Sequence, residues 1–143
     1  MLQFKYKIAG EKMDKLDLIK YWTETSSKDY STMMHLYESR DFHWSLFIGH
    51  LVIEKLLKAL YVQNVDSNTP KTHDLLRLAE KANIELTDGQ QDTLDIITTF
   101  NISARYPDYK QSFYKKCTYE FTRATTEKIK EMRLWLLELL IVK

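Results

Sequence analysis

Apolar residues recur along most of this chain at steps of three and four positions, the spacing of one face of an α-helix. Over residues 14–39 this face runs through Ile19, Trp22, Ser26, Tyr30, Met33 and Tyr37. The same spacing predicts further helices over residues 42–65, 73–83, 87 to just before 107, and 113–141. Within the first twelve residues, Phe4, Tyr6 and Ile8 alternate with polar residues, so this segment is predicted to be a separate N-terminal arm, either extended or a short strand.

The segment 42–65 differs from the others because it has two apolar faces. One face carries Trp44, Phe47, Ile48, Leu51, Val52, Leu56 and Ala59. The other carries Leu46, Ile53, Leu57 and Leu60. A helix that is apolar on two sides is buried among other helices, so this segment is predicted to be the centre of the core.

Three positions mark helix starts and one marks a stop. Asp41 and Thr72 are predicted N-caps, and Thr87 with Gln90 forms the pattern of a capping box. Pro107 forces the residue before it out of the helical region. We therefore expect the helix that begins at residue 87 to end before Pro107, and residues 103–110 to be either a helix terminator or a rigid loop.

Composition supports long helices joined by short connections. The chain has 143 residues with only three glycines and two prolines, and a sheet protein of this size would need more turn residues. This length fits one domain. The sequence predicts an all-α protein, an antiparallel bundle of about five helices over residues 13–143.

The net charge and the single cysteine restrict the kinds of ligand and the cellular compartment that we expect. The formal net charge is +1, so binding to extended nucleic acid is not expected. A single cysteine, Cys117, cannot form an internal disulfide, which favours a reducing compartment, the cytoplasm. Neither a secretory signal nor a membrane-spanning stretch is expected from the apolar pattern.

Strong catalytic and cofactor motifs are absent from the sequence. There is no H-E-x-x-H, no G-x-S-x-G and no glycine-rich phosphate loop. His43, His50 and Glu54 share a helical face, but such spacing alone is a weak indication of a metal. Lys115 and Lys116 could lower the pKa of Cys117, although an idle buried thiol is the more common case. We predict no metal, no cofactor and no catalytic residue.

Three polar stretches are candidates for binding, and each has an ordinary alternative. Arg105 and Tyr106 could present a planar fork and a stacking ring to a ligand, or the segment around them could only end a helix. The charges of Glu54-Lys-Leu-Leu-Lys58 could line a groove, or they could form a solvated stripe. Thr72-His-Asp-Leu75 could be only a helix start with Asp74 near the dipole.

Taken together, these stretches resemble the HEPN family of helical domains. The carriers of the resemblance are Gly49–Leu60 with its E-K-x-L-K-A pattern, the T-H-D-L at residues 72–75 and the A-R-Y-P-D at residues 104–108. Their order and separation agree with the family, and the resemblance extends from about residue 28 to the C-terminus. It implies a bundle of about five helices, commonly dimeric, similar to the C-terminal domain of kanamycin nucleotidyltransferase.

The resemblance also implies functions. Members are nucleotide-associated modules, some are toxins paired with a separately encoded nucleotidyltransferase as antitoxin, and some are ribonucleases with an R-x(4–6)-H motif. That motif is missing here, because no histidine follows His73 and Arg40 precedes His43 by too few residues. A non-catalytic, homodimeric module that binds a nucleotide or a nucleotidyltransferase is therefore expected, with a divergent ribonuclease and a purely structural dimer as alternatives. The expected binding side chains are Glu54, Lys55, Lys58, His73, Asp74, Arg105, Tyr106 and Asp108.

Overall fold

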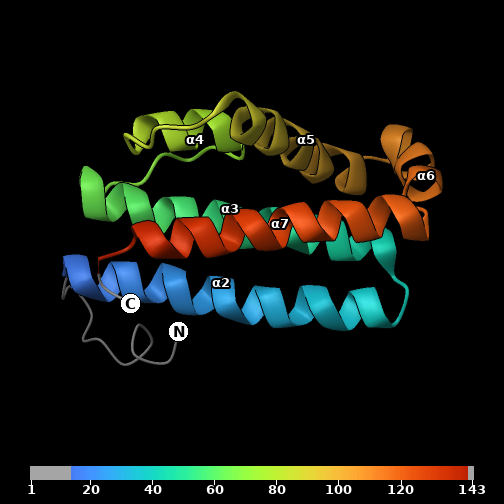
Figure 1. Ribbon diagram of the computed structural model, residues 1–143, viewed down its shortest axis with the longest axis horizontal. Coiled ribbons are helices and arrows are strands. Elements are labelled where there is room, and N and C mark those ends of the chain that lie inside the picture. The colour runs from blue at the N-terminus through green and yellow to red at the C-terminus, as the bar shows by residue number, and fades with distance from the viewer. Residues whose placement is uncertain (1–13, 142–143) are drawn as a thin grey trace.

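The computed structural model describes residues 14–141, and this part of the chain consists of helices joined by short connections (Figure 1). The helices are α2 (Lys15–Glu38), α3 (Phe42–Asn64), α4 (Leu75–Lys81), α5 (Asp88–Arg105), α6 (Pro107–Lys116) and α7 (Tyr119–Leu139). The all-α prediction is confirmed, with six helices among the described residues instead of about five. The predicted N-terminal arm lies outside the described residues.

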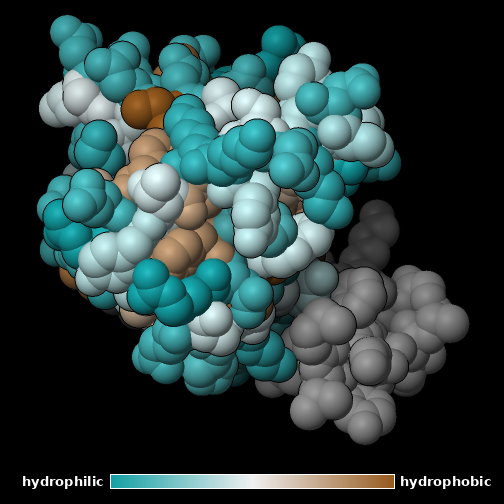
Figure 2. Space-filling model, turned by 90° about the vertical axis from the view of Figure 1, so that its right-hand side faces the viewer, coloured by the Kyte–Doolittle hydropathy of each residue, from teal (hydrophilic) through white to brown (hydrophobic). Residues whose placement is uncertain are grey.

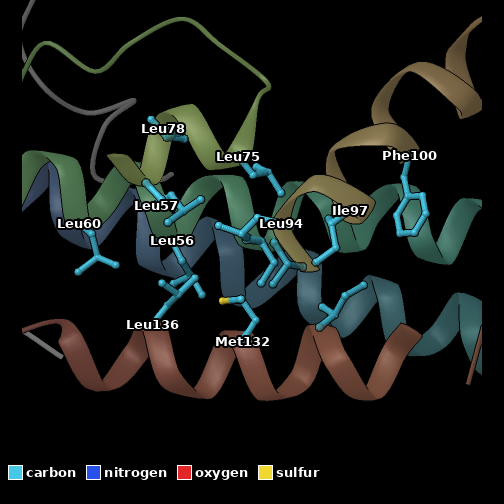
Figure 3. Packing of buried hydrophobic residues seen from close by; sticks show 14 of the residues in the cluster. Leu56, Leu57, Leu60, Leu75, Leu78, Leu94, Ile97, Phe100, Met132 and Leu136 are labelled. Atoms are coloured by element: carbon cyan, nitrogen blue, oxygen red, sulfur yellow. The ribbon is translucent and has the colours of Figure 1, made fainter. Parts of the chain in front are cut away.

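Helix α3 is the centre of the bundle, as its two apolar faces predicted. It packs against each of the other five described helices. Figure 1 shows α3 and α7 in a middle layer, with α2 on one side and α4 and α5 on the other. Leucines dominate the interior, and Figure 3 shows side chains of α3, α4, α5 and α7 meeting there.

Gly49 allows α2, α3 and α7 to approach one another closely. A Cβ atom at this position would lie 2.7 Å from Cδ1 of Ile129 and 3.1 Å from Sδ of Met33. Both distances are shorter than an ordinary van der Waals contact. The glycine therefore fixes how deeply the next residue of α3, His50, is set into the bundle.

The predicted helix starts have mixed outcomes. Thr87 and Gln90 form the expected capping box, each side chain accepting a hydrogen bond from the other's backbone N–H. Asp41 is at the N-cap of α3, but its side chain makes no capping bond and instead accepts one from the Ser39 hydroxyl. The prediction for Thr72 is wrong: the N-cap of α4 is Asp74, whose carboxylate accepts a hydrogen bond from the backbone N–H of Arg77.

The predicted stop before Pro107 is confirmed, but residues 103–110 do not form a rigid loop. Helix α5 continues through Arg105, and α6 begins at Pro107, so Tyr106 is the only residue between them. Tyr106 has an extended backbone, with φ −103° and ψ 129°, as a residue before proline requires. Proline is well suited to the first turn of a helix, because its missing N–H has no intrahelical partner there. It therefore both ends α5 and starts α6.

The segment predicted as one last helix is divided at residues 117–118. Helix α6 ends at Lys116, and Thr118 caps the start of α7 by accepting a hydrogen bond from the backbone N–H of Phe121. A threonine at this position is an ordinary N-cap signal. The break is the reason that the bundle has one more helix than predicted.

Candidate functional site

A buried carboxylate joins two of the three polar stretches. Glu54 lies on α3 and is only 4% exposed. Its Oε1 is 2.7 Å from Nδ1 of His73, and its Oε2 is 3.2 Å from Nζ of Lys58. A carboxylate only accepts hydrogen bonds, so both nitrogens donate. These two donors compensate the desolvation of a charge that would otherwise be costly to bury.

His50 makes a second connection between α3 and the loop that carries His73. Its side chain is fully buried, and Nε2 lies 3.0 Å from the backbone carbonyl oxygen of His73. A carbonyl oxygen can only accept, so Nε2 carries the proton and Nδ1 is the acceptor in the neutral ring. Burial lowers the pKa of His50, which keeps the ring neutral. Its Nδ1 has no hydrogen-bond partner among the described residues.

These contacts make a rigid junction between α3 and the start of α4. We call His50, Glu54, Lys58 and His73 the polar junction. The loop is fixed through both the backbone and the side chain of His73, while half of that side chain remains exposed, at 52%. The ring is thus held from its Nδ1 side, and Nε2 is the nitrogen left available to a ligand.

Arg105 lies beside the junction without being part of it. Its guanidinium is stacked on the ring of Phe47, 5.4 Å from the ring centre, one turn before His50 on α3. Its positive charge also acts to lower the pKa of His50, which indicates that the two groups are close. Among residues 14–141 no carboxylate forms an ion pair with Arg105. Its N–H donors are therefore available.

Of the other predicted lysine and aspartate residues, Lys55 and Asp74 make their contacts outside the polar junction, and Lys58 makes one contact within it and one outside it. Lys55 faces α2, where Nζ lies 2.5 Å from Oδ2 of Asp29. Lys58 also reaches toward α2, because its Nζ lies over the ring of Trp22, 5.0 Å from the ring centre. Asp74 is used as the α4 cap. The two lysines therefore hold α2 and α3 together rather than lining a groove with Arg105.

Tyr106 and Asp108 are exposed at the junction of α5 and α6. Tyr106 is 55% exposed, which leaves its ring free to stack on another molecule. Asp108 is in the first turn of α6, where a carboxylate favours the helix dipole. No ion pair joins it to Arg105 within the described part of the chain. These contacts give no support to a role for Asp108 in orienting Arg105.

Sequence reasoning missed His50, Phe47 and Asn101 as parts of this region. His50 was considered only as a metal ligand. Asn101 precedes Arg105 by one turn on α5, is 8% exposed, and has an Oδ1 atom without a hydrogen-bond partner. A polar residue inside an otherwise apolar helical face is the signal that could have identified both His50 and Asn101.

Metal and thiol chemistry have no support among the described residues. No group of three or more His, Cys, Asp or Glu side chains within residues 14–141 is arranged to hold a metal ion. His43 stacks instead against the rings of Trp44 and Tyr114. Burial raises the pKa of the Cys117 thiol to about 12, and the nearby charge of Lys116 offsets this only in part.

The chain is thus a small helical domain. One buried helix forms its centre, and an internal carboxylate joins that helix to the loop that carries His73. The chain belongs to the HEPN domain family, whose family model matches residues 19–139. The resemblance stated from the three motifs is thereby confirmed. Comparison with curated proteins gives no match, and comparison with solved structures gives none either. No helix within residues 14–141 is long and apolar enough to span a bilayer.

Proposed function

We propose that this chain is a non-catalytic HEPN binding module that recognises the phosphate groups of a nucleotide between Arg105 and His73. The observation that carries the proposal is the exposed guanidinium of Arg105, which has no acidic partner among residues 14–141, is stacked on Phe47, and acts on His50 of the polar junction through its charge. Arginine binds phosphate oxygens through paired N–H donors. In the imidazolium form of His73, Nε2–H can donate a further hydrogen bond to a phosphate oxygen.

Rigidity of the two donors supports this assignment. His73 is attached to α3 through Glu54 and His50, and Arg105 is stacked on Phe47. A site whose side chains are already held in place loses less conformational entropy when a ligand binds. Tyr106, next to Arg105, supplies an exposed ring on which a base can stack.

The same donors would suit a carboxylate on a partner protein, so a nucleotidyltransferase remains the alternative ligand within this proposal. Titration calorimetry with ATP, GTP and inorganic phosphate tests the nucleotide directly. We expect Arg105→Ala to weaken nucleotide binding about tenfold or more, because a charge-assisted hydrogen bond contributes roughly 1.5–3 kcal/mol. Arg123→Ala, which removes an exposed arginine from α7, serves as the control and should have no effect.

Lack of nucleotide binding, or an equal loss in the control, would contradict the nucleotide assignment. Co-purification with the product of a neighbouring nucleotidyltransferase gene, lost in Arg105→Ala, would then identify the partner alternative. A protein that is dimeric by light scattering and indifferent to both substitutions would be a structural dimer only.

A ribonuclease is a second candidate, favoured by one contact. The hydrogen bond from Nδ1 of His73 to the buried carboxylate of Glu54 orients the ring and leaves Nε2 as a possible general base. Incubation of labelled RNA with the protein and with His73→Ala tests this directly. Cleavage that disappears in His73→Ala would support an enzyme, and absence of cleavage by the unsubstituted protein would remove it.

A further inference from the structure

The large exposed side chains of the described chain are divided by chemical type. The aliphatic ones are Leu16, Val65, Ile96, Ile102, Leu134, Leu139 and Ile141, and of these Ile102 lies one turn before Tyr106, next to the α6 end. The aromatic ones are Trp44, Tyr106, Tyr109, Tyr114 and Tyr119. All five come from the start of α3 or from residues 106–119, which lie together at the α6 end of the bundle (Figure 1).

The cations at this end lie on aromatic rings. Nζ of Lys110 is 5.1 Å from the centre of the Trp44 ring. The guanidinium carbon of Arg40 is 5.2 Å from the centre of the Phe42 ring and 5.5 Å from that of Tyr119. These groups, together with His43 and Tyr114, form what we call the aromatic end. Figure 2 looks onto this end and shows apolar atoms in the middle of a hydrophilic rim.

Acidic side chains do not neutralise these cations. Asp108 and Glu120 lie in the same region of the sequence, yet neither forms an ion pair with Arg40 or Lys110 in the described part of the protein. The ion pairs among the described residues instead join residues of α2, α3 and α7 and the loop that carries His73. Asp41 also lies close enough to act on the charge of His43, so this end carries charges of both signs, but Arg40 and Lys110 have no carboxylate partner among the described residues.

A small hollow lies between the rings. It is lined by Arg40, Phe42, His43, Tyr114 and Cys117 and has a volume of about 120 Å³. This is well below the roughly 300–1,000 Å³ of a pocket that encloses a whole small-molecule ligand. The hollow is suited to a single planar ring whose remaining atoms stay outside.

We propose that the aromatic end binds single-stranded nucleic acid, with bases stacked on Trp44 and Tyr114 and phosphates held by Arg40 and Lys110. Exposed rings next to unpaired cations are the arrangement by which proteins bind single strands without reading their sequence. A strand offers one base and one phosphate per nucleotide, and this surface offers a ring and a cation side by side. On binding, a base takes the ring face and the cation moves from the ring to a phosphate.

Other classes of partner fit this surface less well. A lipid surface would be met by several aliphatic side chains, and of the exposed ones only Ile102 adjoins residues 106–119. An acidic peptide would use the cations but would leave the exposed tyrosine rings without a function. This surface adjoins the proposed nucleotide site, because the ring of Trp44 packs edge-on against that of Phe47, on which Arg105 is stacked. Tyr114 and Lys110, however, contact neither Arg105 nor His73 in the described contacts, so they can be tested separately.

The test is fluorescence anisotropy of the full-length protein with labelled oligo-dT and oligo-U of about 12 nucleotides, which exceeds a site of a few nucleotides. We expect Tyr114→Ala to weaken binding about five- to hundredfold, the range for loss of one base–ring stack. Lys110→Ala should weaken binding and reduce the slope of log affinity against log salt by about 0.7. Leu134→Ala and Lys81→Ala remove exposed side chains far from the aromatic end and are the matched controls.

The two strands distinguish the sources of affinity. Equal binding of both supports recognition by stacking and backbone charge, and a preference for oligo-U supports the same surface with added contact to the 2′-hydroxyl. No binding at about 50 mM salt, where phosphate contacts are strongest, would overturn the proposal. So would equal losses in the control variants, or displacement of the strand by poly-glutamate at equal charge concentration. Titration calorimetry also compares mononucleotide binding by Tyr114→Ala and by the unsubstituted protein. Equal affinities would show that the aromatic end and the nucleotide site can be confirmed or contradicted separately.

Discussion

The polar junction and the aromatic end both gather charged side chains, but they neutralise them in different ways. At the junction, Lys58 and His73 donate to one carboxylate that is almost fully buried. At the aromatic end, Arg40 and Lys110 lie on ring faces at the surface and have no carboxylate partner among residues 14–141. The charges of the polar junction therefore make contacts within the protein, whereas the cations of the aromatic end are free to contact another molecule.

This difference separates stability from binding. Removing one member of a buried pair leaves the other desolvated and uncompensated, so the cost falls on folding. Removing a cation from an exposed ring returns that ring to water at little cost, because such a contact contributes roughly 0.5–1 kcal/mol. Substitutions in the two regions should therefore affect different measurements.

The largest expected effect is on stability at the junction. Glu54→Ala should lower the free energy of unfolding by about 3 kcal/mol, the low end of the range for breaking a buried pair. Lys58 keeps some access to solvent, at 14% exposure, which moderates the loss. Urea unfolding monitored by circular dichroism measures the change. Lys110→Ala, the counterpart at the aromatic end, should lower it by no more than about 1 kcal/mol.

Glu54→Gln separates charge from shape in this experiment. The amide oxygen can still accept the hydrogen bond from Nδ1 of His73, so this variant should lose less stability than Glu54→Ala. Equal losses in Glu54→Ala and Lys110→Ala would show that the two regions do not differ in the way described.

The pH dependence of stability sharpens the same comparison. Burial lowers the pKa of His50 from 6.5, so the unfolded chain binds a proton that the folded chain does not. Stability is therefore fully present above the unfolded pKa and is lost as the pH falls below it, by at most about 1.4 kcal/mol per pH unit for one proton. Burial, followed by the charge of Lys110, also lowers the pKa of His43, with the same sign.

Unfolding between about pH 8 and pH 5.5, where histidine titrates, measures this slope. His50→Gln should flatten it more than His43→Gln, because His50 is fully buried and His43 is only half-buried. His35→Gln, an exposed histidine on α2, is the control. A larger flattening in His43→Gln would place the more strongly coupled histidine at the aromatic end.

The sequence predicted the fold better than it predicted the sites, for a physical reason. Helical periodicity is local, so Ile19 to Tyr37 and the two faces of α3 could be read directly. The stop before Pro107 was predicted correctly, but the start of α6 at the same residue was not, although proline also starts helices. The contacts of Lys55 and Lys58 could not be predicted from local patterns, because their partners Asp29 and Trp22 are distant in sequence. The aromatic end was hidden by the balanced total charge.

A smaller effect is expected at an ion pair of intermediate burial. Lys55 and Asp29 are 19% and 21% exposed, between the two extremes compared here. Asp29→Asn should lower the free energy of unfolding by about 1 kcal/mol or less, because solvent screens such a pair. Differential scanning calorimetry with Glu54→Ala in parallel measures both. A loss as large as that of Glu54→Ala would mean that burial is not what distinguishes the junction.

The smallest expected effect leaves stability unchanged and concerns the reactivity of Cys117, which lines the hollow at the aromatic end. The thiol is 7% exposed, and burial raises its pKa to about 12 in spite of the charge of Lys116. Only the thiolate reacts with iodoacetamide, so at about pH 8 the native protein should be labelled far more slowly than the urea-unfolded chain, whose thiol has a pKa of about 8.5. Because Cys117 is the only cysteine, mass spectrometry of the intact protein reports its labelling alone. Rapid labelling of the native protein would show that the rings around the hollow open to solvent, and Tyr114→Ala, which removes one wall of that hollow, should move the rate in that direction.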